Sequence, residues 1–155
     1  MSNHQYNPIK VVGTFVTPGP FGSIDILEGT VDGGEFAALA RDNPTWTREH
    51  DRGGNSTRVR NNNTGARLTV TMSASSPTND TLSRVHALDL ASENQVGTLT
   101  LKDLNGTTRV IADGAFIAES PDPTFGSDRG SRAWVFELGQ TRKFVGGHDP
   151  IGVPA

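Results

Sequence analysis

The residues best suited to acid–base or metal chemistry in this chain are four histidines, because cysteine is absent. They stand at positions 4, 50, 86 and 148, and none has a second histidine at ligand spacing. The run Glu49-His50-Asp51 offers three potential ligands in a row at the end of an expected strand. Neighbours along a strand point to opposite faces, so this run does not predict a metal site. His86 falls beside the apolar stripe of an expected helix, where a surface role is expected.

Motifs that carry catalysis are also missing. No two glycines are separated by a single residue, and no glycine directly precedes Lys10, Lys102 or Lys143, which excludes the usual phosphate loops. There is no His-Glu-x-x-His and no Gly-x-Ser-x-Gly. Two carboxylates such as Asp122 and Asp128 could meet in many folds and do not by themselves indicate a hydrolase. The sequence therefore predicts that the protein is not an enzyme and needs no cofactor and no metal.

Length and charge narrow the class further. The chain has 155 residues and a mass of 16.5 kDa, the size of a single domain. It carries 14 basic and 17 acidic residues, too balanced a set for a protein that grips nucleic acid through its phosphates. No secretory signal or membrane-length apolar run is visible, so we expect no membrane partner and synthesis in a cytoplasm.

Most of the secondary structure that would position functional residues is predicted to be β-strand. Alternating apolar and polar runs lie between clusters of Gly, Asn, Asp and Pro. The predicted strands cover 9–16, 23–28, 35–41, 45–50, 56–61, 66–74, 96–103, 107–113, 115–120 and 132–138. In the last of these, Trp134, Phe136 and Leu138 share a face, which indicates a core face.

Two hairpins and one helix are predicted from local signals. Strands 56–61 and 66–74 are expected to pair across Asn62-Asn63-Thr64-Gly65. Strands 96–103 and 107–113 are expected to pair across Leu104-Asn105-Gly106, in a type I′ turn. The helix begins at Ser76-Pro77-Thr78-Asn79-Asp80, with a serine cap and proline at the first helical position.

The predicted fold class is mainly β, a β-sandwich with barrel-forming sheets and one packed α-helix. Residues 1–145 are expected to form a single domain. The segment 146–155 contains three glycines and two prolines and is expected to be a flexible C-terminal arm.

Charge is unevenly ordered along the chain. Residues 11–40 contain four acids and no base, namely Asp25, Glu28, Asp32 and Glu35. Residues 41–67 contain six bases, all of them arginine, against three acids; among them are Arg48, Arg52, Arg58 and Arg60. Chance clustering on two solvated faces would produce this order. So would a head-to-tail interface in which the acidic surface of one copy meets the basic surface of the next. Arginine suits the second interpretation because its planar fork pairs with carboxylates in a bidentate way.

Several stretches, taken in order, resemble the tail tube proteins of contractile-tailed bacteriophages. They are Tyr6-Asn7-Pro8, the segment from Thr57 to Gly65 that leads into 67–72, Ser75 to Asp80, Lys102 to Thr107, and Arg132-Ala133-Trp134. Each is a structural motif, so the resemblance bears more directly on fold than on role.

The resemblance implies a β-sandwich subunit that assembles into hexameric rings, and the rings stack into a tube in the virion tail. DNA would pass through the lumen without specific binding, and a net charge of −3 per copy suits such a conduit. Sheath, baseplate and tape measure proteins are the implied partners, with synthesis in the host bacterial cytoplasm. The acidic and basic residues named above are then expected to form contacts between subunits or rings.

Three alternatives remain open from the sequence. One is the tube of a related contractile secretion system. Another is a monomeric β-sandwich binding module, although aromatic residues make up only 6% of the chain and Trp46 is the one candidate platform. The last is a small hydrolase whose site carries no recognised motif.

Overall fold

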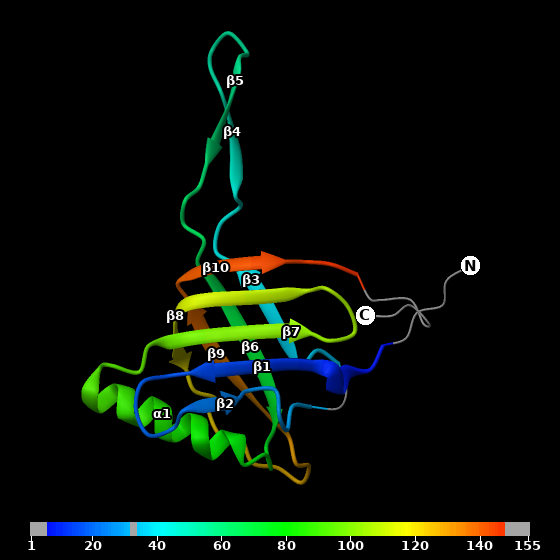
Figure 1. Cartoon of the computed structure of the whole chain (residues 1–155), viewed down its shortest axis with the longest axis vertical. Coiled ribbons are helices and arrows are strands. Elements are labelled where there is room, and N and C mark those ends of the chain that lie inside the picture. Colours follow the sequence, from blue (N-terminus) through cyan, green and yellow to red (C-terminus); the bar gives the residue numbers. More distant parts are fainter. Residues whose placement is uncertain (1–5, 32–33, 148–155) are drawn as a thin grey trace.

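The computed structural model describes residues 6–31 and 34–147, which form two packed antiparallel sheets, a separate two-stranded ribbon, one α-helix and a short 3-10 helix. Figure 1 shows the element order along the chain. The elements are η1 (Pro8–Lys10), β1 (Val11–Val16), β2 (Ser23–Asp25), β3 (Ala37–Arg41), β4 (Trp46–His50), β5 (Ser56–Arg60), β6 (Ala66–Ser73), α1 (Thr78–Ser92), β7 (Gly97–Asp103), β8 (Arg109–Glu119), β9 (Ser131–Leu138) and β10 (Gln140–Phe144).

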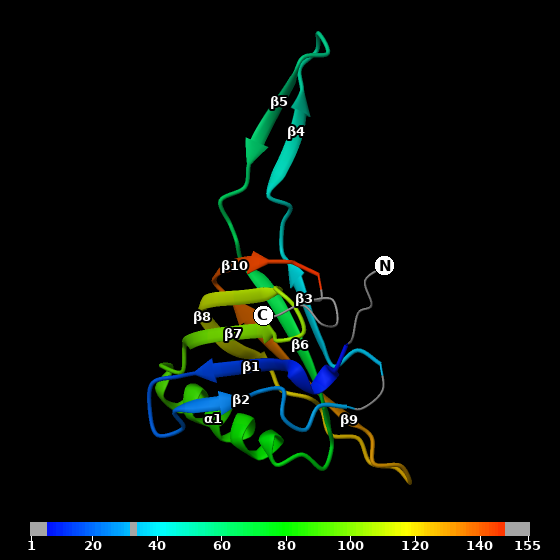
Figure 2. The same cartoon turned by 45° about the vertical axis from the view of Figure 1, so that its right-hand side comes forward.

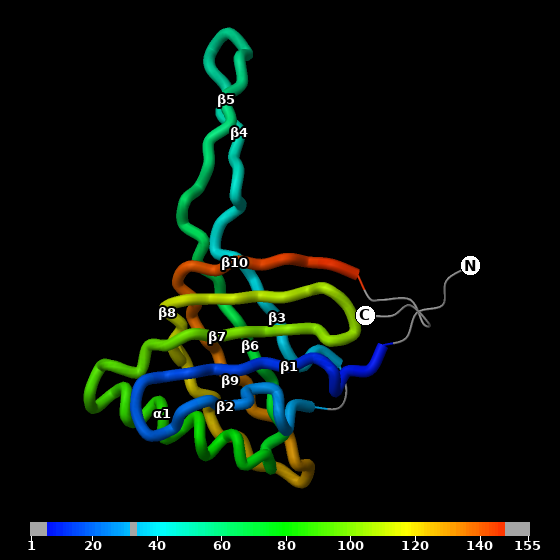
Figure 3. The backbone as a smooth tube through the Cα atoms, viewed as in Figure 1, coloured from blue at the N-terminus to red at the C-terminus, as the bar shows by residue number. Residues whose placement is uncertain are grey.

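Two sheets share strand β8. The first sheet runs in the order β2, β1, β7, β8, β10, and the second in the order β8, β9, β6, β3. The strands of the second sheet cross steeply behind those of the first, as the backbone tube in Figure 3 shows. This arrangement confirms the predicted mainly β fold class with one packed helix.

Glycines at the corner let two strands pass from one sheet to the other. The first half of β8 pairs with β7 and β10, and its last residues pair with β9. Gly114 has φ of +69° at the bend, a conformation that other residues rarely adopt. A Cβ on Gly139, between β9 and β10, would lie 2.7 Å from the carbonyl oxygen of Asp113. Only glycine allows the two backbones to approach this closely.

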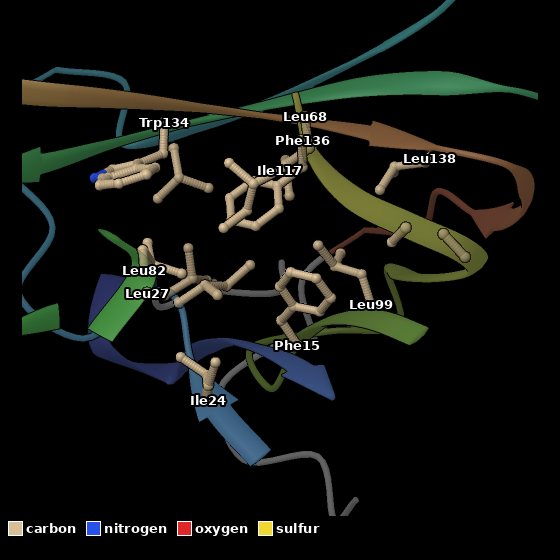
Figure 4. Packing of buried hydrophobic residues seen from close by; sticks show 14 of the residues in the cluster. Phe15, Ile24, Leu27, Leu68, Leu82, Leu99, Ile117, Trp134, Phe136 and Leu138 are labelled. Atoms are coloured by element: carbon tan, nitrogen blue, oxygen red, sulfur yellow. The ribbon is translucent and has the colours of Figure 1, made fainter. Parts of the chain in front are cut away.

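The hydrophobic core lies between the sheets. Phe15 and Phe136 meet edge to face across it, with ring centroids 5.4 Å apart. Figure 4 shows the two rings in the middle of the cluster, with Leu82 of the helix to one side of them, beside Leu27 and Trp134. The predicted core face of the last long strand is confirmed, because Trp134, Phe136 and Leu138 are all buried. The interior is therefore built from side chains of both sheets and α1.

The helix packs on one end of the sandwich, beside β2 (Figures 1 and 2). Leu82 and Val85 enter the core, and Leu88 is half-buried. The predicted serine cap is wrong by one residue, because Pro77 is the N-cap and has no side chain that can accept a hydrogen bond, and the first helical residue is Thr78. The Ser76 hydroxyl still accepts a hydrogen bond from the Thr78 amide at 3.3 Å. Trp134 Nε1 donates to Asn79 Oδ1 at 2.9 Å and so ties β9 to the start of the helix.

One predicted hairpin is wrong. Strand β5 pairs with β4, and β6 pairs with β3 and β9, so the strands on either side of 62–65 are not partners. The physical reason is burial, since alternate residues of β6 are fully buried whereas every residue of β5 is exposed. Hydrogen bonds from Asn63 N to Asn61 Oδ1 and from Gly65 N to Asn63 Oδ1 shape the connection without reversing the chain.

The β7–β8 hairpin is confirmed, but its turn is not type I′. That turn needs positive φ at both central residues, and neither Asn105 nor Gly106 has it. Asp103 Oδ1 instead accepts from the Asn105 amide at 2.9 Å.

Boundaries also differ from the prediction. Strand β2 is shorter than predicted because the Asp25 carboxylate accepts from the Leu27 amide at 3.1 Å and turns the chain. The predicted strands 107–113 and 115–120 are one strand, and β10 was not predicted.

The start of the C-terminal segment is hydrogen-bonded to the body. Gly146 O accepts from Thr108 Oγ1 at 3.1 Å, and the Thr107 amide donates to Gly147 O at 3.2 Å. The remainder of the predicted arm, 148–155, lies outside the described residues.

Candidate assembly surfaces

The most prominent surface is a two-stranded ribbon formed by β4 and β5, residues 46–60, called the basic ribbon below. Within the described residues its strands pair only with each other, and all ten strand residues are exposed. Figures 1 and 2 show it projecting from the body along the long axis of the molecule. None of its side chains belongs to the hydrophobic core.

A local hydrogen-bond set closes the tip of the basic ribbon. Asp51 Oδ1 accepts from the Asn55 amide at 2.8 Å, and Asp51 Oδ2 accepts from Asn55 Nδ2 at 2.9 Å. These bonds, the side-chain one first, lower the pKa of the Asp51 carboxyl below its ordinary value, because they stabilise the charged form. Asp51, a potential metal ligand in the sequence, thus stabilises the turn at the tip of the basic ribbon.

One face of the basic ribbon is cationic and aromatic. The register places Trp46 opposite Arg60 and Arg48 opposite Arg58, and the pleat directs all four side chains to the same side. The Arg58 guanidinium lies 3.7 Å from the centroid of the Trp46 ring, a cation–π stack. Like charges directly opposite each other destabilise a strand pair. In the described part of the chain the ion pairs are Arg67–Glu137 and Arg142–Asp113, so neither neutralises this face.

The basic ribbon therefore receives no packing support from the hydrophobic core that the described residues form. A solitary two-stranded hairpin is only marginally stable in water, and three or more strands or a packing partner are needed for independent stability. Here the unfavourable Arg48–Arg58 juxtaposition adds to that cost. A partner that supplied carboxylates and an apolar wall would remove both deficits.

A concave surface with those properties lies on the body, below called the acidic furrow. It is a cavity of about 660 Å³, and among the described residues its charged lining residues are Asp25 and Glu28. The remaining lining is mostly apolar and comes from the N-terminal segment, β1 and the residues after β2: Tyr6, Pro8, Ile9, Val11, Val12, Leu27, Gly29, Thr30, Val31, Gly34 and Phe36. Ile9 is 85% exposed there.

The N-terminal wall of the acidic furrow is held by a reciprocal amide clamp. The Asn7 amide donates to Asn105 Oδ1 at 3.0 Å, and Asn105 Nδ2 donates to Asn7 O at 2.9 Å. Asn105 is buried. The clamp fixes the segment before β1 on the β7–β8 turn, so two stretches of the sequence that resembled tube proteins hold each other in the fold.

The predicted acidic residues gather near one another. A second cavity of about 470 Å³ adjoins the acidic furrow, because both are lined by Tyr6, Val11, Gly34 and Phe36. Glu35 lines this second cavity together with Lys102 and Lys143. Asp32 lies outside the described residues. Thus Asp25, Glu28 and Glu35 border two cavities that share part of their lining, although they come from different local elements.

The predicted arginines gather elsewhere. Arg48, Arg58 and Arg60 lie on the cationic face of the basic ribbon, and Arg52 lies in the turn at its tip. In Figures 1 and 2 the ribbon points away from β2 and from the segment before β1. The structure therefore separates the acidic and basic sets onto different parts of one subunit, as a head-to-tail contact requires.

The outer face of the second sheet is nearly free of unpaired charge. Thr69, Thr71, Ala133 and Val135 alternate with the buried residues of β6 and β9. Across these strands Arg67 Nη2 and Glu137 Oε1 form an ion pair at 2.7 Å. The hydrogen bonds that Arg67 donates to Glu137 Oε1, followed by the negative charge of Glu137, raise the pKa of the Arg67 guanidinium above its ordinary value.

The residues singled out for chemistry stay apart. Glu49 and His50 are on opposite faces of the basic ribbon, and Asp122 and Asp128 are exposed in the loop between β8 and β9. Within 6–31 and 34–147 no three His, Asp or Glu residues form a group that could hold a metal ion. In the same residues, no helix has the length and apolar character needed to span a membrane.

Sequence reasoning missed the pairing of the basic ribbon, the Arg58–Trp46 stack and the acidic furrow. The alternation of side-chain types along β4 and β5 could have predicted the projecting ribbon. Both strands place cations on one side, and a strand pair without a single strongly apolar face is a candidate for projection away from a core.

Comparison with known proteins gives one sequence relative and several structural neighbours. No protein-family model matches the chain. The structural protein ORF10 of Pseudomonas phage KPP10 is 33% identical over 97 residues, which are 61% of this chain. The match spans 56% of that relative, a little over half its length.

Solved structures of low sequence identity share the fold. The sheath/tube terminator of the extracellular contractile injection system PVC, in its extended state, matches with a TM-score of 0.61 at 12% identity, covering 92% of this chain and 99% of that one. A chain of the PVC sheath–tube complex gives 0.58 at 10% identity, covering 90% and 91%. A chain of the anti-feeding prophage tube-terminating cap gives 0.57 at 9% identity, covering 94% and 95%.

These findings establish a coarse assignment. The chain is related to a phage structural protein and has the fold of tail components of contractile injection systems. The relative and the neighbours are structural parts, which confirms the expectation that the chain is not an enzyme.

Proposed function

We propose that this protein is the repeating subunit of a phage tail tube, assembled as hexameric rings that stack around a DNA conduit. The observation that carries the proposal is the basic ribbon, a fully exposed element with a cationic face and no support from its own body. A monomeric binding module has no need of such an element, whereas a subunit in a stack gains an extra contact from it.

Open sheet edges support assembly between copies. In the described residues β3 pairs only with β6, β2 only with β1, and β10 only with β8, which leaves one side of each strand free. Unpaired edges invite pairing with another chain, and closure into a ring removes them. The relation to a phage structural protein and the fold shared with tube, sheath–tube and cap chains agree with this use.

The outer face of the second sheet suits the wall of a conduit. Small neutral side chains dominate it, and its Arg67–Glu137 pair neutralises itself. A wall without free cations does not retain a polyphosphate by counterion release. DNA would pass through the lumen, while sheath, baseplate and tape measure proteins would be the partners of the tube in the virion.

A second candidate function is a terminator that caps the tube with a single ring. It is favoured by the likeness to the PVC terminator and the anti-feeding prophage cap. Such a ring would use the same lateral contacts but would not repeat along the axis.

Negative-stain electron microscopy of the purified chain, from micromolar to millimolar concentration, separates these functions. Tubes with a regular axial repeat support the repeating subunit. Closed rings that never lengthen support the terminator. Monomers at every concentration, in parallel sedimentation runs, would refute both.

A further inference from the structure

We infer that the acidic furrow is the docking site for the basic ribbon of a second copy of this chain. The inference rests on the proposed function and names the two surfaces through which one subunit holds the next. The occupant is the face that carries Trp46, Arg58 and Arg60, and the receptor is the furrow around Asp25 and Glu28.

Charge complementarity is the first argument. In the part of the furrow that the structure describes, the charged lining residues are two carboxylates, and both belong to exposed residues. The ribbon face presents three guanidinium groups, Arg48, Arg58 and Arg60, without an ion-pair partner in the described residues of their own subunit. A guanidinium binds a carboxylate through two parallel hydrogen bonds, so each surface supplies what the other lacks.

Shape and apolar character are the second argument. A cavity of about 660 Å³ falls in the range of roughly 300–1,000 Å³ that encloses a group of drug-like size. Trp46 is 44% exposed even with Arg58 stacked on it, and aromatic side chains with arginine dominate the energetics of protein interfaces. Phe36 and the exposed Ile9 offer the indole an apolar wall.

Position makes the contact intermolecular. The ribbon extends away from the body, whereas the furrow lies beside the segment before β1 and the turn after β2 (Figures 1 and 2). A ribbon therefore reaches a furrow only on another copy. Because the two surfaces differ, a docked pair still presents one free ribbon on one copy and one free furrow on the other, and the contact repeats without limit unless it closes.

Nucleic acid is the other occupant that an arginine and tryptophan face could attract. The same chain, however, carries a matching acidic depression, and its net charge is −3. These observations favour a second copy over a polyphosphate. DNA binding by the ribbon is kept as an outcome of the test.

The test is a charge swap in the full-length chain. One variant is R58E/R60E, a second is D25R/E28R, and a third combines all four changes. The concentration at half-assembly is measured by sedimentation velocity, with tube or ring length scored by electron microscopy. Each double variant is expected to raise that concentration by about 100-fold, about tenfold for each charge reversed. The combined variant is expected to recover assembly to within about tenfold of the wild type.

Two further variants serve as controls for charge and for the local fold. D25N/E28Q removes both charges but keeps an Oδ1 acceptor for the Leu27 amide, so it weakens assembly without disturbing the turn. D122R/D128R reverses two exposed carboxylates in the loop between β8 and β9 and should assemble as the wild type does. Circular dichroism of each variant at low concentration checks that the subunit is folded.

The outcomes are distinct. Failure of the wild type to associate refutes the proposed function itself. Wild-type assembly by D25R/E28R, loss of assembly in D122R/D128R, or no recovery in the combined variant overturns the furrow as receptor and leaves the proposed function standing. If R58E/R60E assembles normally but loses retention of double-stranded DNA, the ribbon binds nucleic acid and the inference is wrong.

Discussion

Removal of the basic ribbon should abolish assembly while leaving the fold intact. The backbone offers a clean junction, because the Asp42 amide donates to Gly65 O at 3.1 Å beside the paired residues Arg41 and Ala66. Residues 43–64 can therefore be replaced by Asn-Gly, a two-residue hairpin turn that continues the β3–β6 ladder. The variant keeps every residue of the hydrophobic core.

The expected change in unfolding free energy is close to zero. The deletion removes three hydrogen bonds to retained residues, from the Thr141 amide to Thr64 Oγ1, from the Gly65 amide to Asn63 Oδ1 and from Arg41 Nη1 to Thr45 Oγ1, together about 3 kcal/mol. Shortening the connection from 22 residues to two lowers the entropy cost of closing it by about 2 kcal/mol at most. The two effects oppose each other, so the net change should lie within about 1 kcal/mol.

Urea unfolding followed by tryptophan fluorescence measures this directly. Only Trp134 remains in the variant, and it is 2% exposed in the fold, so the signal reports the core alone. Sedimentation velocity measures assembly in the same samples. A loss of more than about 3 kcal/mol would show that the ribbon is part of the cooperative fold. Rings or tubes formed by the variant would refute the reasoning that the ribbon is a contact between copies.

The remaining predictions concern the body of the subunit and the tip of the ribbon. Gly139→Ala should lower the free energy of unfolding in urea by about 1–3 kcal/mol, because the new Cβ would lie 2.7 Å from a backbone oxygen. Gly126→Ala, with nothing within 4 Å of its Cβ, should be neutral, and equal effects of the two changes would contradict the close approach of the backbones at Gly139. Trp134→Phe should cost about 2 kcal/mol and lower Tm by about 4–8 °C, since a buried hydrogen bond and volume are lost, and an unchanged Tm would refute this. Because the pKa of Asp51 is lowered in the fold, its carboxylate stabilises the ribbon tip above the ordinary pKa of an aspartate, and this stabilisation is lost as the pH falls through the lowered pKa. Asn55→Ala should raise the pKa of Asp51 back toward its ordinary value, as measured by NMR titration of the carboxyl.

Local patterns in the sequence were sufficient for much of the sandwich. The face shared by Trp134, Phe136 and Leu138 identified a core strand because alternation reports burial directly. The serine and proline before the helix located its start to within two residues, although the N-cap is Pro77 and not the predicted Ser76.

Pairing between strands was less predictable. Strand β5 looked like the partner of β6 because asparagines and a glycine lie between them, yet β6 pairs with strands far along the chain. Turn signals show where a chain can reverse, but burial decides whether it does. Strand β10 was missed because its sequence lacks an apolar face, and it exists as a continuation of β9 around the glycine corner.

The candidate surfaces were likewise predictable from the sequence in part. The order of charge along the chain predicted that acids and arginines would occupy separate regions, and the structure places the described members in this way. Whether these residues contact another copy stays a prediction. The furrow itself needed the tertiary fold, because Tyr6, Asp25 and Phe36 approach one another only after the N-terminal clamp and the turn after β2 have formed.

The attachment of the ribbon has a mechanical consequence. Its two strands lead directly into β3 and β6, and β6 is hydrogen-bonded along its length to β9 as well as to β3. A pull on the ribbon along the long axis therefore loads these ladders in shear, so that many hydrogen bonds must break together. A pull across the strands would open them one at a time. The chain is thus expected to resist a pull along its long axis more strongly than a pull across its strands.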